Sequence, residues 1–171
     1  MTTKKLIVII GATGGQGGSV VNSFLNDPRW RVLGITRNPL SQKSKNLGAR
    51  DVEVVQADLD DRASLAKAFH DANVIFAVSD FWGIYNDPKN RNNGTASQRV
   101  DKERFIMSSL PGPMKLSRGK YTNVCRHDSK ADAEGYGEQN QPELWAKTSV
   151  YLPGYFLSNF LTHPMAQPTK V

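Results

Sequence analysis

The sequence has a single cysteine, Cys125, in 171 residues. One cysteine cannot form an intrachain disulfide, which excludes the disulfide-stapled scaffolds of small secreted proteins. No apolar run approaches the roughly 18 residues that a membrane-spanning helix needs. Only five consecutive apolar residues, at positions 6–10, precede the first glycine, too few for the core of a secretory signal peptide. We therefore expect no membrane partner and a cytoplasmic location, with the nucleus left open.

The composition is otherwise that of a folded chain. The hydrophobic residues make up 39%, and the 14 glycines raise this share to about 47%, the usual range for globular proteins. The length suggests one domain. We assign residues 1–160 to that domain and residues 161–171 to a short C-terminal tail.

The net charge of +6 is unevenly distributed. Basic residues dominate at 1–50 and 82–130, and acidic residues dominate between these two segments. Such basic segments raise a nucleic-acid partner as a possibility. However, no segment alternates basic with aromatic residues, and no metal-ligand spacing occurs. The charge therefore favours an anionic small ligand, without direct nucleic-acid binding and without a metal.

Strands and helices alternate along the predicted chain. A short β-branched run bounded by glycine is typical of a buried parallel strand. Such alternation predicts a Rossmann-like α/β fold, a doubly wound parallel sheet of about six strands. We place strands at 5–10, 30–36, 52–56, 73–79, 104–109 and 147–152, with helices at 19–25, before 48 and at 60–70.

The later connections depart from this alternation. Residues 81–103 include Pro88 and almost no apolar residue after Tyr85. This composition predicts a long loop where a crossover helix is expected. Residues 114–120 read as a basic loop. Ser129 and Asp132 form a predicted capping box before a helix at 131–136.

A glycine-rich turn follows the first strand, with the spacing GxxGxxG at Gly11, Gly14 and Gly17. The first glycine allows the tight turn, the second lets backbone approach a pyrophosphate, and the third lets helix and strand pack closely. The following helix N-terminus offers free N–H groups to phosphates. The turn between strand and helix predicts a dinucleotide site.

The end of the second strand indicates which dinucleotide. Folds that prefer NAD usually place an acidic residue there to hold the ribose hydroxyls. Here the segment is Gly-Ile-Thr-Arg-Asn, and Arg37 can pair with a 2′-phosphate through two charge-assisted hydrogen bonds. Lys43 and Lys45 add positive charge nearby. We predict NADP(H) as the cofactor.

Asp58 and Leu59 follow the third strand. In such folds this position lies beside the adenine, where Asp58 accepts a hydrogen bond from the exocyclic amine. Asp58 and Asp60 also precede the third helix, so either could serve as its N-cap. The two roles are compatible.

Taken together, the segments GATGGQGGSVV, GITRNP, VEVVQADLDD, FAVSDFW, FIMSSLPG, HDSKA and GYFLSN resemble the NmrA-like family. These are atypical members of the short-chain dehydrogenase/reductase superfamily. The resemblance runs from about Lys4 to Phe160. Family members are longer, which predicts a chain shortened internally and truncated at its C-terminus, with one sheet face partly uncovered.

The resemblance implies a residue set for the cofactor. It places phosphates at the glycine turn, a 2′-phosphate at Arg37, adenine at Asp58, ribose beyond the fourth strand, and the nicotinamide end beside Lys130. The implied cofactor-binding residues are Gly11, Ala12, Thr13, Gly14, Gly15, Gln16, Gly17, Arg37, Asp58, Leu59, Asp80, Phe81, Trp82, Lys130, Gly154, Tyr155, Phe156 and Asn159.

The implied catalytic set is Lys130 with Ser108 and Ser109 at the end of the fifth strand. Superfamily catalysis uses a tyrosine four residues before the lysine as general acid. That position holds Arg126, which cannot act as an acid at neutral pH. Neither Tyr121 nor Tyr136 has the required spacing, and His127 reads as a structural or surface residue.

Two functions follow from this pattern. One is an NADP-dependent oxidoreductase acting on a small carbonyl or alcohol substrate, which the near-complete cofactor set favours. The other is a non-catalytic NADP(H) sensor that binds a regulatory protein, which the absent tyrosine favours. The sequence leaves the substrate, the partner and the oligomeric state open.

Overall fold

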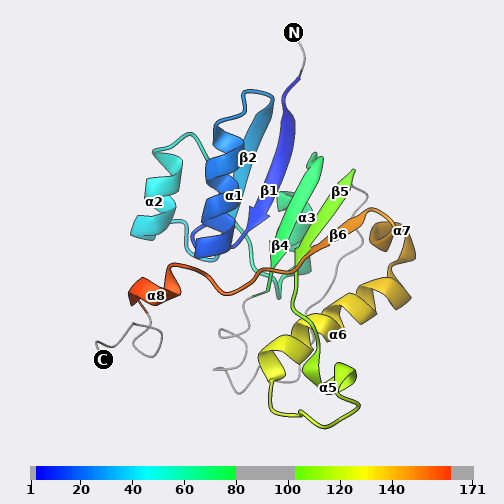
Figure 1. Cartoon of the computed structure of the whole chain (residues 1–171). Coiled ribbons are helices and arrows are strands. Elements are labelled where there is room, and N and C mark those ends of the chain that lie inside the picture. Colours follow the sequence, from blue (N-terminus) through cyan, green and yellow to red (C-terminus); the bar gives the residue numbers. More distant parts are fainter. Residues whose placement is uncertain (1–2, 80–102, 163–171) are drawn as a thin grey trace, which may run out of the picture.

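The structure is a computed structural model that describes residues 3–79 and 103–162 (Figure 1). Its core is a six-stranded, all-parallel sheet in the order β3-β2-β1-β4-β5-β6. The strands are β1 (Lys5–Ile10), β2 (Trp30–Thr36), β3 (Glu53–Gln56), β4 (Val74–Val78), β5 (Arg104–Ser108) and β6 (Thr148–Tyr151). This is the predicted doubly wound Rossmann-like sheet.

The strands form where the sequence predicts them because both faces of the sheet are buried. In β1, Ile7, Val8 and Ile9 are fully buried, so a continuous apolar run is favoured over an alternating one. The bounds of β1 and β2 match the prediction, and each other strand ends within one residue of it.

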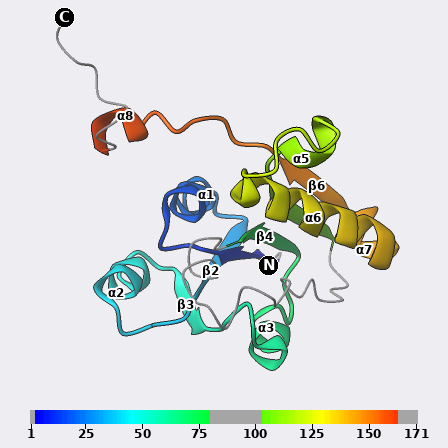
Figure 2. The ribbon, with the colours of Figure 1, turned by 90° about the horizontal axis from the view of Figure 1, so that it is seen from below.

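Helices cover the two faces of the sheet (Figure 2). On one face, α1 (Gly15–Leu25) packs Val21 against Ile7, Ile9 and Phe76, and α2 (Gln42–Gly48) adds Leu47. On the other face, α3 (Arg62–Ala68), α6 (Cys125–Asn140) and α7 (Pro142–Trp145) line a small apolar cavity of about 110 Å³ over β4 and β5. No helix of the described residues is long and apolar enough to cross a membrane.

Three helix predictions need correction. Residues 114–120 are not all loop, because α5 (Pro113–Leu116) begins there with proline in its first turn. The predicted capping box is wrong, since α6 starts at Cys125 and Ser129 lies inside it, donating to the Arg126 carbonyl. The helix at 60–70 is shorter, and Asp61 caps it rather than Asp58 or Asp60.

Two further features complete the fold. After β6 the chain crosses the carboxyl ends of the strands to α8 (Asn159–Thr162) (Figure 1). The predicted missing crossover helix between β4 and β5 falls mostly in residues 80–102, outside the described residues.

Candidate functional site

A cleft of about 1090 Å³ lies at the carboxyl ends of the strands. The strand order reverses between β1 and β4, and open α/β sheets bind their ligands at such a switch point. The cleft is lined by Ile10, Gly11, Thr13, Gly14, Gly15, Gln16, Gly17, Ile35, Thr36, Arg37, Asn38, Ala57, Asp58, Leu59, Asp60, Val78, Ser79, Ser108, Leu110, Pro111, Arg126, His127, Lys130, Pro153, Gly154, Tyr155, Phe156, Ser158 and Asn159.

The turn from β1 into α1 requires glycine at two positions. Gly11 has φ +71°, the left-handed region that glycine adopts readily. A Cβ on Gly17 would overlap the backbone of Gly11, so only glycine lets the helix approach the turn this closely. The first N–H groups of α1, which have no partner within the helix, border the cleft. The turn is therefore a cradle that fits a phosphate group.

Arg37 follows the last residue of β2 and lines the cleft. The loop after β2 is fixed by the buried Ser44, whose hydroxyl donates to the Asn38 carbonyl at 2.8 Å. Gln56 of β3 donates to the Arg37 carbonyl at 3.3 Å. Lys43 and Lys45 of α2 do not line the cleft, so Arg37 is the basic residue that the structure presents there from this loop.

Asp58 and Leu59 also line the cleft, just beyond β3. The Asp58 backbone N–H donates to the Ser64 hydroxyl, which holds this loop against α3. Because Asp61 accepts from the N–H groups of Ala63 and Ser64, the capping role is filled and the Asp58 carboxylate is not needed for it.

Lys130 of α6 is a buried cation that lines the cleft. Its Nζ donates to the Ser79 hydroxyl at 3.1 Å and to the Ser108 carbonyl at 3.4 Å, which ties α6 to the ends of β4 and β5. Burial, and after it the positive charge of Arg126, lowers the pKa of Lys130. The structure thus partners Lys130 with protein atoms rather than leaving it extended into solvent.

The two catalytic serine candidates separate in the structure. Ser108 lines the cleft, and its hydroxyl donates to Gln16 Oε1 at 2.8 Å, which joins it to the glycine turn. Ser109 does not line the cleft; its hydroxyl is fully buried without a hydrogen-bond partner among the described residues. Of the two serines, the structure therefore assigns only Ser108 to the cleft.

The predicted binding residues otherwise converge on this cleft. Ala12 is the exception among those described, since its side chain packs into the core below the turn. Gly154, Tyr155, Phe156 and Asn159 form the far wall. Asp80, Phe81 and Trp82 lie outside the described residues.

Sequence reasoning missed several cleft residues. Ser79 directly follows β4, where the rule that ligands bind at carboxyl ends of strands would have found it. His127, which was expected to be a structural or surface residue, lines the cleft; it lies three residues before Lys130 on α6, and residues at this spacing share a helix face. Neither Tyr121 nor Tyr136 lines the cleft, whereas Tyr155 does.

The sequence profile of the NmrA-like family matches residues 3–170. The chain belongs to the NmrA-like family. An NmrA-like family domain-containing protein of Dictyostelium discoideum is 30% identical over 172 residues, which cover 97% of this chain and 55% of that protein. The NmrA-like family domain-containing oxidoreductase hkm9 of Aspergillus hancockii is 29% identical over 180 residues, which cover 96% of this chain and 50% of that protein.

Solved structures share the fold of this NmrA-like chain. NmrA, a negative transcriptional regulator, in complex with NADP has a TM-score of 0.65 at 21% identity, over 88% of this chain and 45% of that one. An NADPH-dependent quinone oxidoreductase of Escherichia coli has a TM-score of 0.60 at 24% identity, over 91% and 50%. The NmrA-like chain spans about half the length of the curated relatives it matches.

Proposed function

We propose that this NmrA-like chain binds NADP(H) in the cleft and acts as an NADP-dependent oxidoreductase on a small carbonyl or alcohol substrate. The observation that carries the proposal is one continuous cleft with a glycine cradle at its middle and Arg37 beyond β2. The cradle suits a pyrophosphate, and the guanidinium suits the extra phosphate that distinguishes NADP from NAD. Family members named oxidoreductases and an NADP complex of NmrA support it.

Each part of the cleft has a role in this proposal. The glycine turn and the start of α1 hold the pyrophosphate, Arg37 holds the 2′-phosphate, and Asp58 accepts from the adenine amine. Lys130 and the wall formed by Gly154, Tyr155 and Phe156 border the nicotinamide end. When bound, the cofactor supplies or accepts a hydride.

The chain's own residues would act on the substrate oxygen. The Ser108 hydroxyl donates to Gln16 in this structure and would turn to donate to a carbonyl oxygen, which polarises it. The buried Lys130 cation, next to Ser108, would stabilise negative charge that develops on that oxygen. His127 and Tyr155 line the cleft and carry exchangeable protons, so either would serve as the proton donor that Arg126 cannot be.

The first experiment tests the cofactor. We expect isothermal titration to give NADPH a roughly tenfold to hundredfold advantage over NADH, the effect of one charge-assisted phosphate contact. Arg37→Glu should abolish this advantage and leave NADH affinity nearly unchanged. Lys45→Glu, which makes the same charge change outside the cleft, is the matched control. Equal affinities of the unaltered protein for NADPH and NADH would contradict the proposal.

The second experiment separates the oxidoreductase from a non-catalytic sensor, which the arginine at position 126 favours. NADPH absorbance is followed in single turnover with a panel of aldehydes, ketones and quinones. Oxidation that Ser108→Ala slows by at least about tenfold, and that the buried neighbour change Ser109→Ala leaves intact, supports catalysis. No oxidation with any acceptor, together with a regulatory protein partner that distinguishes NADP from NADPH, supports the sensor.

A further inference from the structure

An exposed apolar surface runs from β6 to α8. Within residues 148–162, which we call the apolar strip, eight large hydrophobic side chains are at least one-third exposed. They are Val150, Tyr151, Leu152, Tyr155, Phe156, Leu157, Phe160 and Leu161. Leu157 and Leu161 are 81% and 79% exposed, values expected for polar surface residues rather than leucines.

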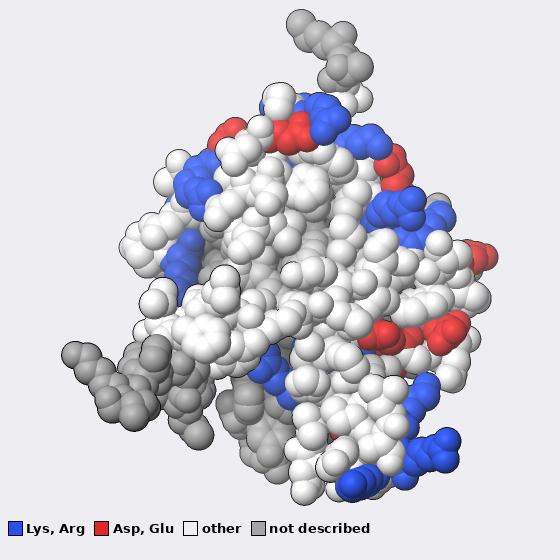
Figure 3. All heavy atoms as spheres, viewed as in Figure 1, with Lys and Arg blue, Asp and Glu red and all other residues white. Residues whose placement is uncertain are grey.

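The apolar strip carries no charge. Residues 148–162 contain no Asp, Glu, Lys, Arg or His, although the chain has a net charge of +6. Figure 3 shows a mostly white surface across this face, with Lys and Arg gathered toward its margins. Two copies can therefore approach each other strip to strip without bringing like charges into contact.

The area of the strip matches what an interface needs. Its eight side chains together expose roughly 700–900 Å², at about 150–200 Å² for a fully exposed large side chain. Specific interfaces bury about 800 Å² on each partner, which is an area of the same order.

The strip also begins on an edge strand. β6 pairs only with β5 among the described residues, so its outer edge presents N–H and C=O groups that can pair with a strand of another molecule. Pro153, which has no N–H, limits such pairing to the residues before it.

We propose that the apolar strip is the interface of a homodimer, in which the strips of two copies pack face to face across a twofold axis. In an isologous interface the same surface of both copies meets, so that surface must be complementary to itself. The uncharged, apolar strip meets this requirement. The proposal does not depend on which nucleotide occupies the cleft.

The test is the mass of the full chain in sedimentation equilibrium. We expect a dimer, twice 18.9 kDa, at micromolar concentrations. Leu157→Glu and Leu161→Glu should each weaken dimerisation by at least about tenfold, because each change removes an apolar contact twice by symmetry and buries a charge. Neither residue lines the cleft.

Matched controls are available elsewhere on the surface. Leu40 and Leu116 are 77% and 73% exposed and lie outside the strip, so Leu40→Glu and Leu116→Glu should leave the mass unchanged. A monomer at every concentration overturns the proposal, and so does an open-ended series of aggregates or an equal response to strip and control changes. A dimer that binds no dinucleotide would refute the proposed function alone, and a monomer that binds NADPH would refute the dimer alone.

Discussion

Gly17 shows how strictly a single residue can fix the nucleotide turn. A Cβ at this position would meet backbone atoms of Gly11, which cannot move aside as a flexible side chain could. We expect Gly17→Ala to lower the free energy of unfolding by about 1–3 kcal/mol and to abolish dinucleotide binding. Urea denaturation and calorimetric titration measure the two effects.

The neighbouring Gly18 is the control for this prediction. A Cβ there would lie 3.6 Å from the Ala12 carbonyl oxygen, an ordinary contact, and the position is inside α1. Gly18→Ala should therefore stabilise the protein by about 0.5–1 kcal/mol through helix propensity. If both alanines had the same effect, the turn would not require the close approach that the structure shows.

Lys130 gives the protein a predictable pH dependence. Burial, followed by the Arg126 charge, lowers its pKa below 10.5 in the folded state, whereas the unfolded chain regains the ordinary value. Between these two values the unfolded state binds more protons, so the folded state gains stability as pH rises through this window. Below the lowered pKa the cost of the buried charge is fully present.

We therefore compare unfolding of the unaltered protein and Lys130→Met at pH 7 and pH 10. The free energy of unfolding of the unaltered protein, relative to that of Lys130→Met, should be higher at pH 10 than at pH 7, because methionine cannot lose a proton. Lys67→Met, the same replacement at an exposed position of α3, is the control. A difference that stays constant with pH would mean that the Lys130 ammonium is not penalised by the fold.

At the scale of elements, the sequence predicts strands better than helices. A strand buried on both faces needs a run of apolar residues, and β1 and β2 show such runs plainly. The helices of this protein are stabilised by contacts that do not require apolar residues at regular helical spacing, so their sequences show little helical periodicity. Three of the first four residues of α1 are glycines, so the apolar stripe reveals only the later part of the helix.

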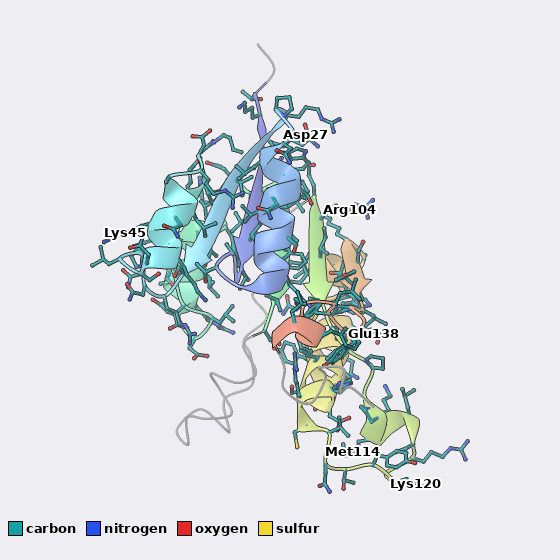
Figure 4. The ribbon with its side chains drawn as sticks, turned by 60° about the vertical axis from the view of Figure 1, so that its left-hand side comes forward. Asp27, Lys45, Arg104, Met114, Lys120 and Glu138 are labelled. Atoms are coloured by element: carbon teal, nitrogen blue, oxygen red, sulfur yellow. The ribbon has the colours of Figure 1, made fainter. Side chains whose placement is uncertain are left out.

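α6 is the clearest case of a helix that composition conceals. Its sequence includes Gly135 and Gly137, which disfavour a helix interior, and few apolar residues, so no apolar stripe marks the helix. Tertiary contacts compensate for this: Lys130 is buried against Ser79 and Ser108, and glycine at position 137 leaves room for the Trp145 ring, which a Cβ there would meet at 3.2 Å. Figure 4 shows α6 and α5 extending from the carboxyl side of the sheet, with Met114 and Lys120 at the far tip.

In the candidate site too, residues at strand ends were easier to predict than residues on helices. Residues on the turns after β1, β2 and β3 could be predicted, because a parallel sheet brings the carboxyl ends of its strands to one edge. On α6, the family resemblance pointed to Lys130 but not to His127, because which residues of that helix face the cleft depends on how the helix packs. The sequence alone did not show which of the two adjacent serines faces the cleft, because this depends on strand register.

At the scale of the whole molecule, one segment joins the proposed dimer to the proposed cofactor site. Tyr155 and Phe156 belong to the apolar strip and also line the cleft. A partner copy that packs on the outer side of this segment would order the wall that a dinucleotide contacts from the inner side. Whichever event comes second then loses less conformational entropy, so the two events should favour each other.

This linkage predicts a reciprocal effect of definite size. Saturating NADPH should lower the dimer dissociation constant by about fivefold or more, and the dimer should bind NADPH more tightly than the monomer by the same factor. Sedimentation with and without NADPH gives the first ratio, and titration of Leu157→Glu against the unaltered protein gives the second. If both ratios equal one, dimerisation through the strip and NADPH binding in the cleft are independent. If the two ratios differ, Leu157→Glu alters the cleft directly, because linkage requires the two ratios to agree.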